Sequence, residues 1–438
     1  MRASTDRILT THVGSLQTPE YIDPDKFRAM TDDQLGAAVA EVVRGQKAAG
    51  VDILNEGELT KGGIWVTYIH ERFGGFEPIP AGGEPVLPPA RDWIDFPGYY
   101  AERMGGGSPG RAAGGLACTG PVTYRGKALM QREIDLLLGA LGDTPRSDAF
   151  LTSTAPLSLL QGRRNDHYRT EEAFLEAIAD AIRVEYRMIT DAGLLLQVDD
   201  AWLAALWDRI GHGMGLEAYR RYCEPRVEAL NYALEGIPAE RVSYHLCWGS
   251  WPGPHSHDIP MANIVDLMLK VNAQAYLFEA ANGRHEHEHV VWRGVELPDD
   301  KILIPGVISH CTPVVEHPEL VAERLMRFAA IVGRERVMAG HRLRPRHPHP
   351  SPGGLGQAEV HGRRRRYRQR RPVGAEVRRL AVVLGRLAFV ALLDRVVVVG
   401  DDTADGRARQ GVTAGEMAGD AADHGASDAA LGVGRAGS

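Results

Sequence analysis

The chain has few cysteines. Only four occur among 438 residues, and no two are closely spaced. Small secreted domains that depend on disulfides carry many more cysteines at short, regular spacings. The sequence therefore excludes a disulfide-stapled scaffold and favours a reducing compartment. The four are Cys118, Cys223, Cys247 and Cys311.

The sequence also has little that would direct it to a membrane. The first seven residues, Met1-Arg-Ala-Ser-Thr-Asp-Arg, are not followed by an apolar segment, so we expect no secretory signal. The apolar run at 380–400 contains Arg386, Asp394 and Arg395, which argues against a membrane span. We expect a cytoplasmic protein with no membrane partner.

Clustered positive charge is missing from the first two thirds of the chain. The formal net charge is -7, and basic residues there are scattered, which gives no electrostatic basis for binding nucleic acid. An arginine-rich run at 363–371 is the exception. With 44% hydrophobic and 24% charged residues, the composition is that of a globular enzyme with one large domain or two smaller ones.

Short apolar runs alternate with longer amphipathic segments as far as Gly340, which is the pattern of parallel strands joined by helices. Strands are predicted at 8–15, 51–58, 150–156, 194–199, 242–247, 275–279, 302–308 and 336–340. Helices are predicted between them, notably at 31–49, 170–192, 216–235, 264–271 and 318–332. Eight such strands indicate an α/β fold, the closed (β/α)8 or TIM barrel.

A long insertion follows the second predicted strand. Residues 74–115 are rich in glycine and proline, and 116–124 then reads as a further short strand. Long segments of this kind in a compact domain are more often functional than idle. We expect a lid over the barrel mouth or, equally, an oligomer contact.

Most predicted strands end in polar residues that can do chemistry. The carboxyl ends of barrel strands and the loops after them form the active face of this fold, so we expect these side chains to meet at one mouth. The residues are Ser15, Glu58, Asp199, His245, Cys247 and Glu279.

His245 and Cys247 lie two residues apart near the end of a predicted strand. Residues at i and i+2 of a strand share a face, so an imidazole and a thiolate can converge on one ion, with the Glu279 carboxylate arriving from the next strand. Alone, a His-X-Cys pair is more often an ordinary half-buried polar pair. The added carboxylate and the strand order favour a metal site.

Other polar residues allow more than one interpretation. The cluster His285-Glu-His-Glu-His289 could bind a structural metal, form a solvated loop or line the mouth beside Glu279. Asp200 could bind substrate or cap the segment containing Trp202. Cys118 and Cys223 are expected to be inert, buried side chains.

In their order and spacing these residues resemble the cobalamin-independent methionine synthases, specifically their C-terminal catalytic barrel and shorter stand-alone homologues. The landmarks are Thr10-Thr-His-Val-Gly-Ser15, Asn55-Glu-Gly-Glu58, Leu196-Gln-Val-Asp-Asp200, His245-Leu-Cys247, Glu279, and Pro305-Gly-Val-Ile308 with Val315-Glu-His-Pro-Glu319. The resemblance implies that His245, Cys247 and Glu279 bind Zn²⁺. It also implies that Ser15, Glu58 and Asp199 contact the amino-acid part of a homocysteine-like thiol.

The chemistry of thiols agrees with this resemblance. A free thiol has a pKa of about 8.5 and is mostly protonated at neutral pH, whereas the thiolate is the nucleophile that zinc coordination supplies. The family resemblance implies a methyltetrahydrofolate-like methyl donor. Two alternatives remain. The enzyme could transfer a larger alkyl group or act on another thiol such as coenzyme M, or the chain could be a truncated barrel without activity.

The family's fourth zinc ligand is a cysteine in a Thr/Pro-Asp-Cys-Gly segment after the eighth strand, and no cysteine follows Gly340 in this chain. Reading from the second base of the His341 codon permits ACC GAC TGC GGC, which encodes Thr-Asp-Cys-Gly. We hypothesise a one-base frameshift near Gly340. Cys311 could in principle replace the missing ligand.

The sequence thus predicts two regions. Residues 1–340 form the methionine-synthase-like barrel. Residues 341–438 form a low-complexity tail rich in Arg, Gly and Ala, which we expect to be out of frame and disordered, so the eighth helix is lost or replaced.

Overall fold

The structure is a computed structural model and describes residues 1–16, 30–61, 65–79, 86–103, 115–249, 253–309, 311, 314 and 316–340. The predictions made for 341–438, including the frameshift, the lost helix, the arginine run and the apolar run at 380–400, lie outside the described residues. They remain predictions. Within the described part of the chain, no helix combines the length and apolar character needed to cross a bilayer.

The centre of the fold is a parallel sheet of five strands in the order β4-β6-β7-β8-β9. Its strands have continuous register, for example Asp199 with His245 and Leu277 with Ile304. A second, two-stranded parallel sheet pairs β1 with β10. The strands are β4 (Phe150–Thr154), β6 (Leu195–Asp200), β7 (Val242–Leu246), β8 (Ala275–Glu279), β9 (Ile302–Gly306), β1 (Leu9–Thr10) and β10 (Met338–Ala339).

Isolated bridges and hydrogen bonds join these two sheets into a ring. Gly306 bridges to Gly340 in parallel, which links β9 to the end of β10. On the other side, Leu54 bridges to Ala149 before β4, and the amide of Ile53 donates to the Thr10 carbonyl at 3.1 Å. Residues 51–54 therefore act as the second member of the ring, and the predicted (β/α)8 barrel is confirmed.

The first two predicted strands are shorter than expected. β1 covers only Leu9–Thr10, and residues 51–58 contribute a bridge rather than a regular strand. The backbone turns at Gly14, where φ is 115°, and again at Gly57 and Glu58, where φ is 80° and 54°. Left-handed backbone of this kind cannot continue a strand.

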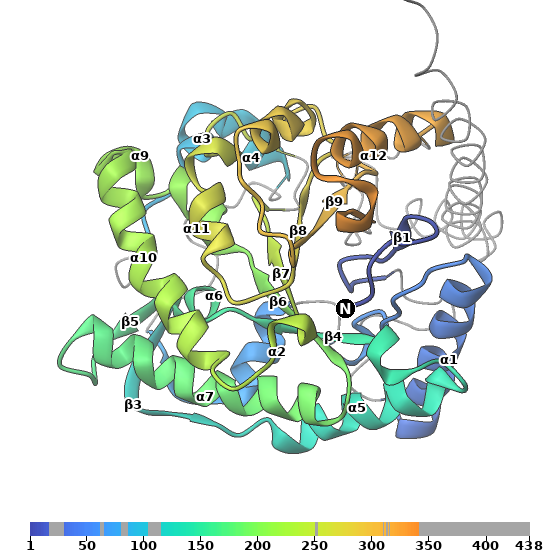
Figure 1. Cartoon of the computed structure of the whole chain (residues 1–438). Coiled ribbons are helices and arrows are strands. Elements are labelled where there is room, and N and C mark those ends of the chain that lie inside the picture. Colours follow the sequence, from blue (N-terminus) through green and yellow to red (C-terminus); the bar gives the residue numbers. More distant parts are fainter. Residues whose placement is uncertain are drawn as a thin grey trace, which may run out of the picture. The chain divides into compact units, whose positions relative to one another are not determined.

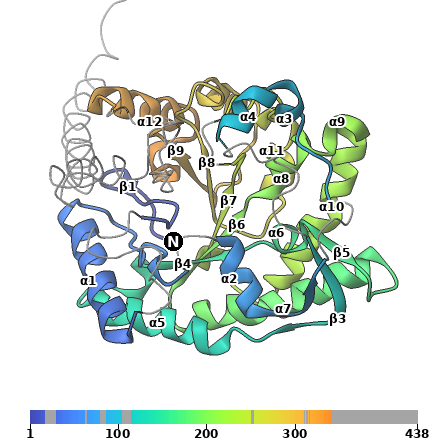
Figure 2. The same ribbon diagram turned by 180° about the vertical axis from the view of Figure 1, so that it is seen from behind.

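Helices surround the strands (Figures 1 and 2). All five predicted helices form, and α5 is an additional one. The long helices are α1 (Asp32–Ala48), α5 (Lys127–Leu141), α7 (Glu171–Asp191), α10 (Leu216–Ala233) and α12 (Pro318–Val332), and the short ones are α6 (Pro156–Leu160), α8 (Trp202–Ala205), α9 (Gly211–Met214) and α11 (Val265–Leu269). Thr170 shows why α7 begins where it does: its side chain accepts from the Ala173 amide, and Glu171 follows in the first turn.

Two apolar clusters stabilise the barrel. A small cluster fills its interior, with Phe150, Leu195, Leu277 and Ile304 among its members. A much larger cluster packs the outer faces of the strands against the helices. Strand residues alternate between the two clusters because side chains on a strand alternate in direction.

A three-stranded sheet lies outside the ring, with strand order β2-β3-β5. β2 (Phe73–Pro78) is antiparallel to β3 (Leu116–Tyr124), which confirms the predicted strand at 116–124, and β3 is parallel to β5 (Arg163–Asn165). α2 (Trp65–Arg72) precedes the insertion, and the insertion itself contributes α3 (Arg91–Asp95) and α4 (Pro97–Arg103). Figure 2 shows α3 and α4 beside the ends of the barrel strands.

Candidate active site at the barrel mouth

Strand register places the predicted metal ligands on the inner face of the barrel. His245 is paired with Asp199 on one side and with Leu277 on the other. Leu277 belongs to the cluster inside the barrel, so this level of the sheet faces inward. Cys247 lies two residues after His245, and Glu279 lies two residues after Leu277. Because side chains on a strand alternate in direction, both are expected to face the inside of the barrel as well.

His245 forms a hydrogen-bonded pair with Asp199. The His245 Nδ1 lies 2.9 Å from Asp199 Oδ1, and the imidazole is buried. Gln197 Nε2 donates to the same carboxylate oxygen at 2.9 Å and to the Val13 carbonyl at 2.7 Å. An ionised carboxylate holds the proton on Nδ1 and leaves Nε2 as the basic nitrogen, an arrangement typical of metal-ligating histidines.

The other two predicted ligands are held by backbone amides. The buried Cys247 Sγ accepts from the Gly249 amide at 3.1 Å. Glu279 Oε1 accepts from the amides of Ala280 and Ala281 at 3.2 Å each. An imidazole, a thiolate and a carboxylate are the donor types that zinc prefers. Among the described residues, however, no three His, Cys, Asp or Glu side chains converge closely enough to hold an ion.

Glu58 follows residues 51–54, the second member of the ring. Thr152 Oγ1 donates to Glu58 Oε1 at 2.6 Å, and the Lys61 ammonium lies 3.8 Å from the same oxygen. Burial raises the pKa of the Glu58 carboxyl, Lys61 opposes this effect, and the charge of Asp199 adds to it. Glu58 and Asp199 therefore lie close enough for their charges to interact, and their role in binding substrate stays a prediction.

The segment that follows β1 packs against Glu58. A side chain at Gly14 would come within 2.8 Å of the Thr152 methyl group and 3.2 Å of Glu58 Oε1, so only glycine fits there. Ser15 follows and is half-buried. The structure thus brings the end of the first strand to Glu58, and Asp199 to His245.

Sequence reasoning missed the buried ionisable residues beneath this mouth. Burial lowers the pKa of His12 to about 4, so its ring is neutral, and its Nε2 lies 2.8 Å from Gln46 Oε1. Lys61 is buried and donates to the Thr152 carbonyl at 2.6 Å. The position of Lys61 three residues after Glu58 was the only available signal, because that spacing permits an ion pair.

Glu56 is fully buried and neither carboxylate oxygen has a hydrogen-bond partner. Burial raises its pKa to about 8, with Lys61 opposing the shift. A carboxyl group without partners in a site of low dielectric is most stable when protonated. The folded protein therefore holds a proton on Glu56 at neutral pH.

This proton makes stability depend on pH. Between an unfolded pKa of about 4.5 and the folded value near 8, the folded state binds more protons, so the free energy of unfolding should fall as pH rises. Each pH unit is worth up to about 1.4 kcal/mol. Glu56→Gln mimics the protonated form and should flatten this dependence between pH 5.5 and 8 in denaturant titrations. Parallel curves for the variant and the wild type would contradict the assignment.

Several ambiguous residues now have defined contacts. Asp200 Oδ1 accepts from the amides of Trp202 and Leu203 at 3.1 and 3.0 Å, which selects the capping role. Cys118 and Cys223 are fully buried, as expected. In the 285–289 cluster, His285 contacts Glu288 while Glu286 pairs with arginines of α12. These side chains contact different partners, and the structural-metal interpretation of the cluster stays a prediction.

Cys311 is held by an arginine. Arg284 Nη2 lies 3.4 Å from its Sγ, and the Cys311 amide donates to Ser309 Oγ at 3.4 Å. This contact does not bring Cys311 into a group of three ligands among the described residues. Replacement of the missing ligand by Cys311 stays a prediction.

No family model matches the chain. It is 24% identical over 377 residues to a 2-hydroxypropyl-CoM lyase of Xanthobacter autotrophicus. The aligned region covers 77% of this chain and 89% of that protein. It is 24% identical over 273 residues to a methionine synthase of Saccharolobus solfataricus, covering 60% of this chain and 69% of that protein.

The fold has a solved counterpart. The B12-independent methionine synthase from Shewanella sp. W3-18-1, solved in complex with selenomethionine, superposes with a TM-score of 0.57 at 16% identity. The match covers 90% of this chain and 99% of that one. The sequence relatives and the shared fold confirm that this chain resembles the cobalamin-independent methionine synthases.

Proposed function

We propose that this protein is a zinc-dependent S-methyltransferase that transfers a methyl group from a methyltetrahydrofolate-type donor to homocysteine or a related thiol. The observation that carries the proposal is the His245–Asp199 pair at 2.9 Å, with Cys247 following on the same face of β7. A carboxylate that orients an imidazole beside a cysteine is a typical arrangement around a catalytic zinc ion. The relatives named methionine synthase support the same reaction.

In this proposal His245 Nε2, Cys247 Sγ and Glu279 would hold the zinc ion, and the substrate thiol would bind beside them. Bound zinc supplies a thiolate at neutral pH by lowering the pKa of the thiol. The three side chains do not form a group that could hold an ion among the described residues, so they would have to move closer together to bind zinc. Glu279 is the last residue of β8, and its Oε1 accepts from the amides of Ala280 and Ala281.

The acidic side of the mouth suits an amino-acid substrate. Glu58 and Asp199 repel each other, which is one cause of the raised pKa of Glu58. An ammonium group between them would relieve this repulsion and donate charge-assisted hydrogen bonds to both carboxylates. The Gly14 amide already donates to His12 Nδ1 at 3.1 Å, so the Ser15 amide is the one that would suit the substrate carboxylate. These contacts would orient the sulfur of a homocysteine-like thiol toward His245 and Cys247.

A second candidate function is alkyl transfer involving another thiol, such as coenzyme M. It is favoured by the relative named 2-hydroxypropyl-CoM lyase, which aligns with 77% of this chain. Coenzyme M carries a sulfonate where homocysteine carries an α-amino acid group, and it has no ammonium group. Two carboxylates at the mouth would repel a sulfonate, so the electrostatics of Glu58 and Asp199 favour homocysteine.

The test compares the two thiols on the purified full-length chain and on a frame-corrected chain that restores Thr-Asp-Cys-Gly after Gly340. We expect methyl transfer to homocysteine and little to 2-mercaptoethanesulfonate, with tighter zinc binding in the frame-corrected chain. Glu58→Gln should raise the KM for homocysteine about tenfold or more, because it removes a charge-assisted contact. Preference for the sulfonate thiol would select the second candidate, and absence of zinc with no transfer to either thiol would reject both.

A further inference from the structure

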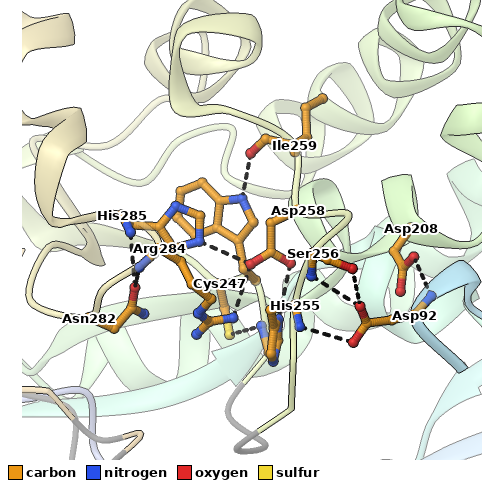
Figure 3. A network of polar contacts seen from close by, with 12 residues as sticks. Asp92, Asp208, Cys247, His255, Ser256, Asp258, Ile259, Asn282, Arg284 and His285 are labelled. Carbon is orange, nitrogen blue, oxygen red and sulfur yellow. Dashed lines mark hydrogen bonds and ion pairs between the residues drawn. The ribbon is translucent and has the colours of Figure 1, made fainter. Parts of the chain in front are cut away.

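A buried polar network ties the insertion to the loops that follow two barrel strands (Figure 3). The first loop follows β7 and Cys247, and the part of it that joins this network begins at 253. The second loop follows β8 and begins directly after Glu279. The insertion contributes Asp92 from α3. The two predicted ligands at the ends of β7 and β8 are thus neighbours, in sequence, of loops that this network joins to each other.

Asp92 is the point where the insertion meets the first loop. It is 1% exposed, and its two oxygens accept four hydrogen bonds. Oδ2 accepts from the His255 amide at 2.9 Å and the Tyr100 hydroxyl at 2.7 Å, and Oδ1 accepts from the Ser256 amide and hydroxyl at 3.0 and 2.8 Å. Burial alone would raise the pKa of the Asp92 carboxyl, but these donors outweigh burial and lower it. Asp92 is therefore an anion that fixes the backbone at 255–256.

The backbone that Asp92 fixes has an unusual conformation. His255 has a φ of 50°, in the left-handed region that residues with side chains rarely adopt. Such a conformation persists only when its surroundings impose it. The Asp92 carboxylate contacts the His255 amide, and Asp258 Oδ1 lies 3.0 Å from His255 Nδ1. These contacts hold the imidazole of His255 in a buried position.

Asp258 carries the network into the second loop. Its Oδ2 accepts from Arg284 Nη1 at 2.9 Å and contacts His285 Nε2 at 3.1 Å. His285 Nδ1 in turn contacts Glu288 Oε2 at 2.7 Å, so both ring nitrogens face carboxylates and the ring is cationic. Consistently, these two carboxylates raise the pKa of His285 against the effect of burial. Glu288 Oε1 then accepts from the Met261 amide at 2.6 Å, which returns the network to the first loop.

We propose that Asp92 is a positioning residue for the reaction, because it sets the loops after β7 and β8 through His255 and Asp258. The catalytic part of this inference rests on the proposed function, because the two loops adjoin Cys247 and Glu279, which are proposed as zinc ligands. Asp92 itself does not touch the reacting atoms. Asp92→Asn would place an amide NH₂ against two of the four donors and leave them unpaired, while keeping the size of the side chain.

The first experiment follows hydrogen exchange by mass spectrometry in the full-length chain. Asp92→Asn should speed amide exchange about tenfold or more in peptides covering 253–261 and also 280–288, and leave α10 unchanged. Ser256→Ala removes one of the four donors and should give a smaller effect. Glu102→Gln is the matched control, because Glu102 lies on α4 of the insertion and is exposed. Faster exchange confined to residues next to 255, with 280–288 unaffected, would overturn the proposal.

The second experiment separates positioning from general loss of fold. In the methyl-transfer assay, Asp92→Asn should lower kcat about tenfold to a hundredfold with little change in KM, because small displacements of reacting groups cost rate rather than binding. Glu102→Gln should leave both values unchanged. An equal kcat for Asp92→Asn and wild type would contradict the inference. If the wild type transfers no methyl group, the proposed function fails, and the exchange experiment still decides whether Asp92 couples the two loops.

Discussion

Replacing Cys247 with serine is expected to remove bound zinc and to reduce methyl transfer to background. Cys247 is buried on the inner face of the barrel, two residues beyond the His245 that pairs with Asp199. A serine hydroxyl is not ionised at neutral pH and is a poor zinc ligand, so the metal site would lose its soft donor. Metal analysis of the purified proteins and the transfer assay measure the two effects separately.

Cys223→Ser provides the matched control for this variant. Cys223 is equally buried, but it lies on α10 and packs in the outer apolar cluster rather than inside the barrel. The same chemical change there should lower stability slightly and leave the zinc content and kcat unchanged. If Cys247→Ser retained both zinc and activity, the assignment of the metal to β7 would be wrong.

Arg72→Met is expected to destabilise the protein by about 3–5 kcal/mol. Arg72 is 2% exposed and lies at the end of α2, where it forms ion pairs with Glu133 of α5 and Glu185 of α7. Removing the guanidinium leaves two carboxylates buried without their cation, which costs far more than the loss of a surface ion pair. Denaturant titration at pH 7 measures this loss as a drop in the free energy of unfolding.

Two further variants make the Arg72 prediction specific. Arg125→Met alters an exposed arginine on the same side of the insertion and should change stability by less than about 0.5 kcal/mol. Combining Arg72→Met with Glu133→Gln and Glu185→Gln removes the uncompensated charges and should recover part of the lost stability. A loss below about 1 kcal/mol for Arg72→Met alone would contradict the buried-network interpretation.

The same network explains how the insertion is attached to the barrel. Tyr124 at the end of β3 donates to Glu185 at 2.6 Å, and Ser153 of β4 donates to the other oxygen of that carboxylate at 2.7 Å. Glu185 therefore joins the insertion, a barrel strand and α7. The buried network around Arg72 and the network around Asp92 hold the insertion at two separate places.

Much of the barrel was predictable from local patterns. The strands β4, β6, β7, β8 and β9 form where short, nearly continuous apolar runs end in polar residues, because strands buried on both faces carry such runs. Side chains alternate in direction along a strand, which predicts that His245 and Cys247 share a face. The helix α12 has its predicted bounds, since proline at its start and an apolar stripe define it locally.

The first part of the barrel was less predictable. Residues 51–58 carry an apolar run, but Gly57 and Glu58 turn the chain and only Leu54 bridges to the next segment. The glycine- and proline-rich insertion gave no periodic signal for α3 or α4. Short helices of this kind are decided by tertiary contacts, such as those of Asp92, rather than by propensity.

The sequence by itself determined the barrel class, the order of its strands and the set of chemically capable residues at their ends. Periodicity and strand parity are local properties, and this is why they could be read without a structure. Only the tertiary structure decided which ionisable groups meet. It paired Asp199 with His245, left Glu56 without a partner, and used Asp92 to hold a distant loop. Such contacts join residues far apart in the chain, and their energies depend on burial that no local pattern encodes.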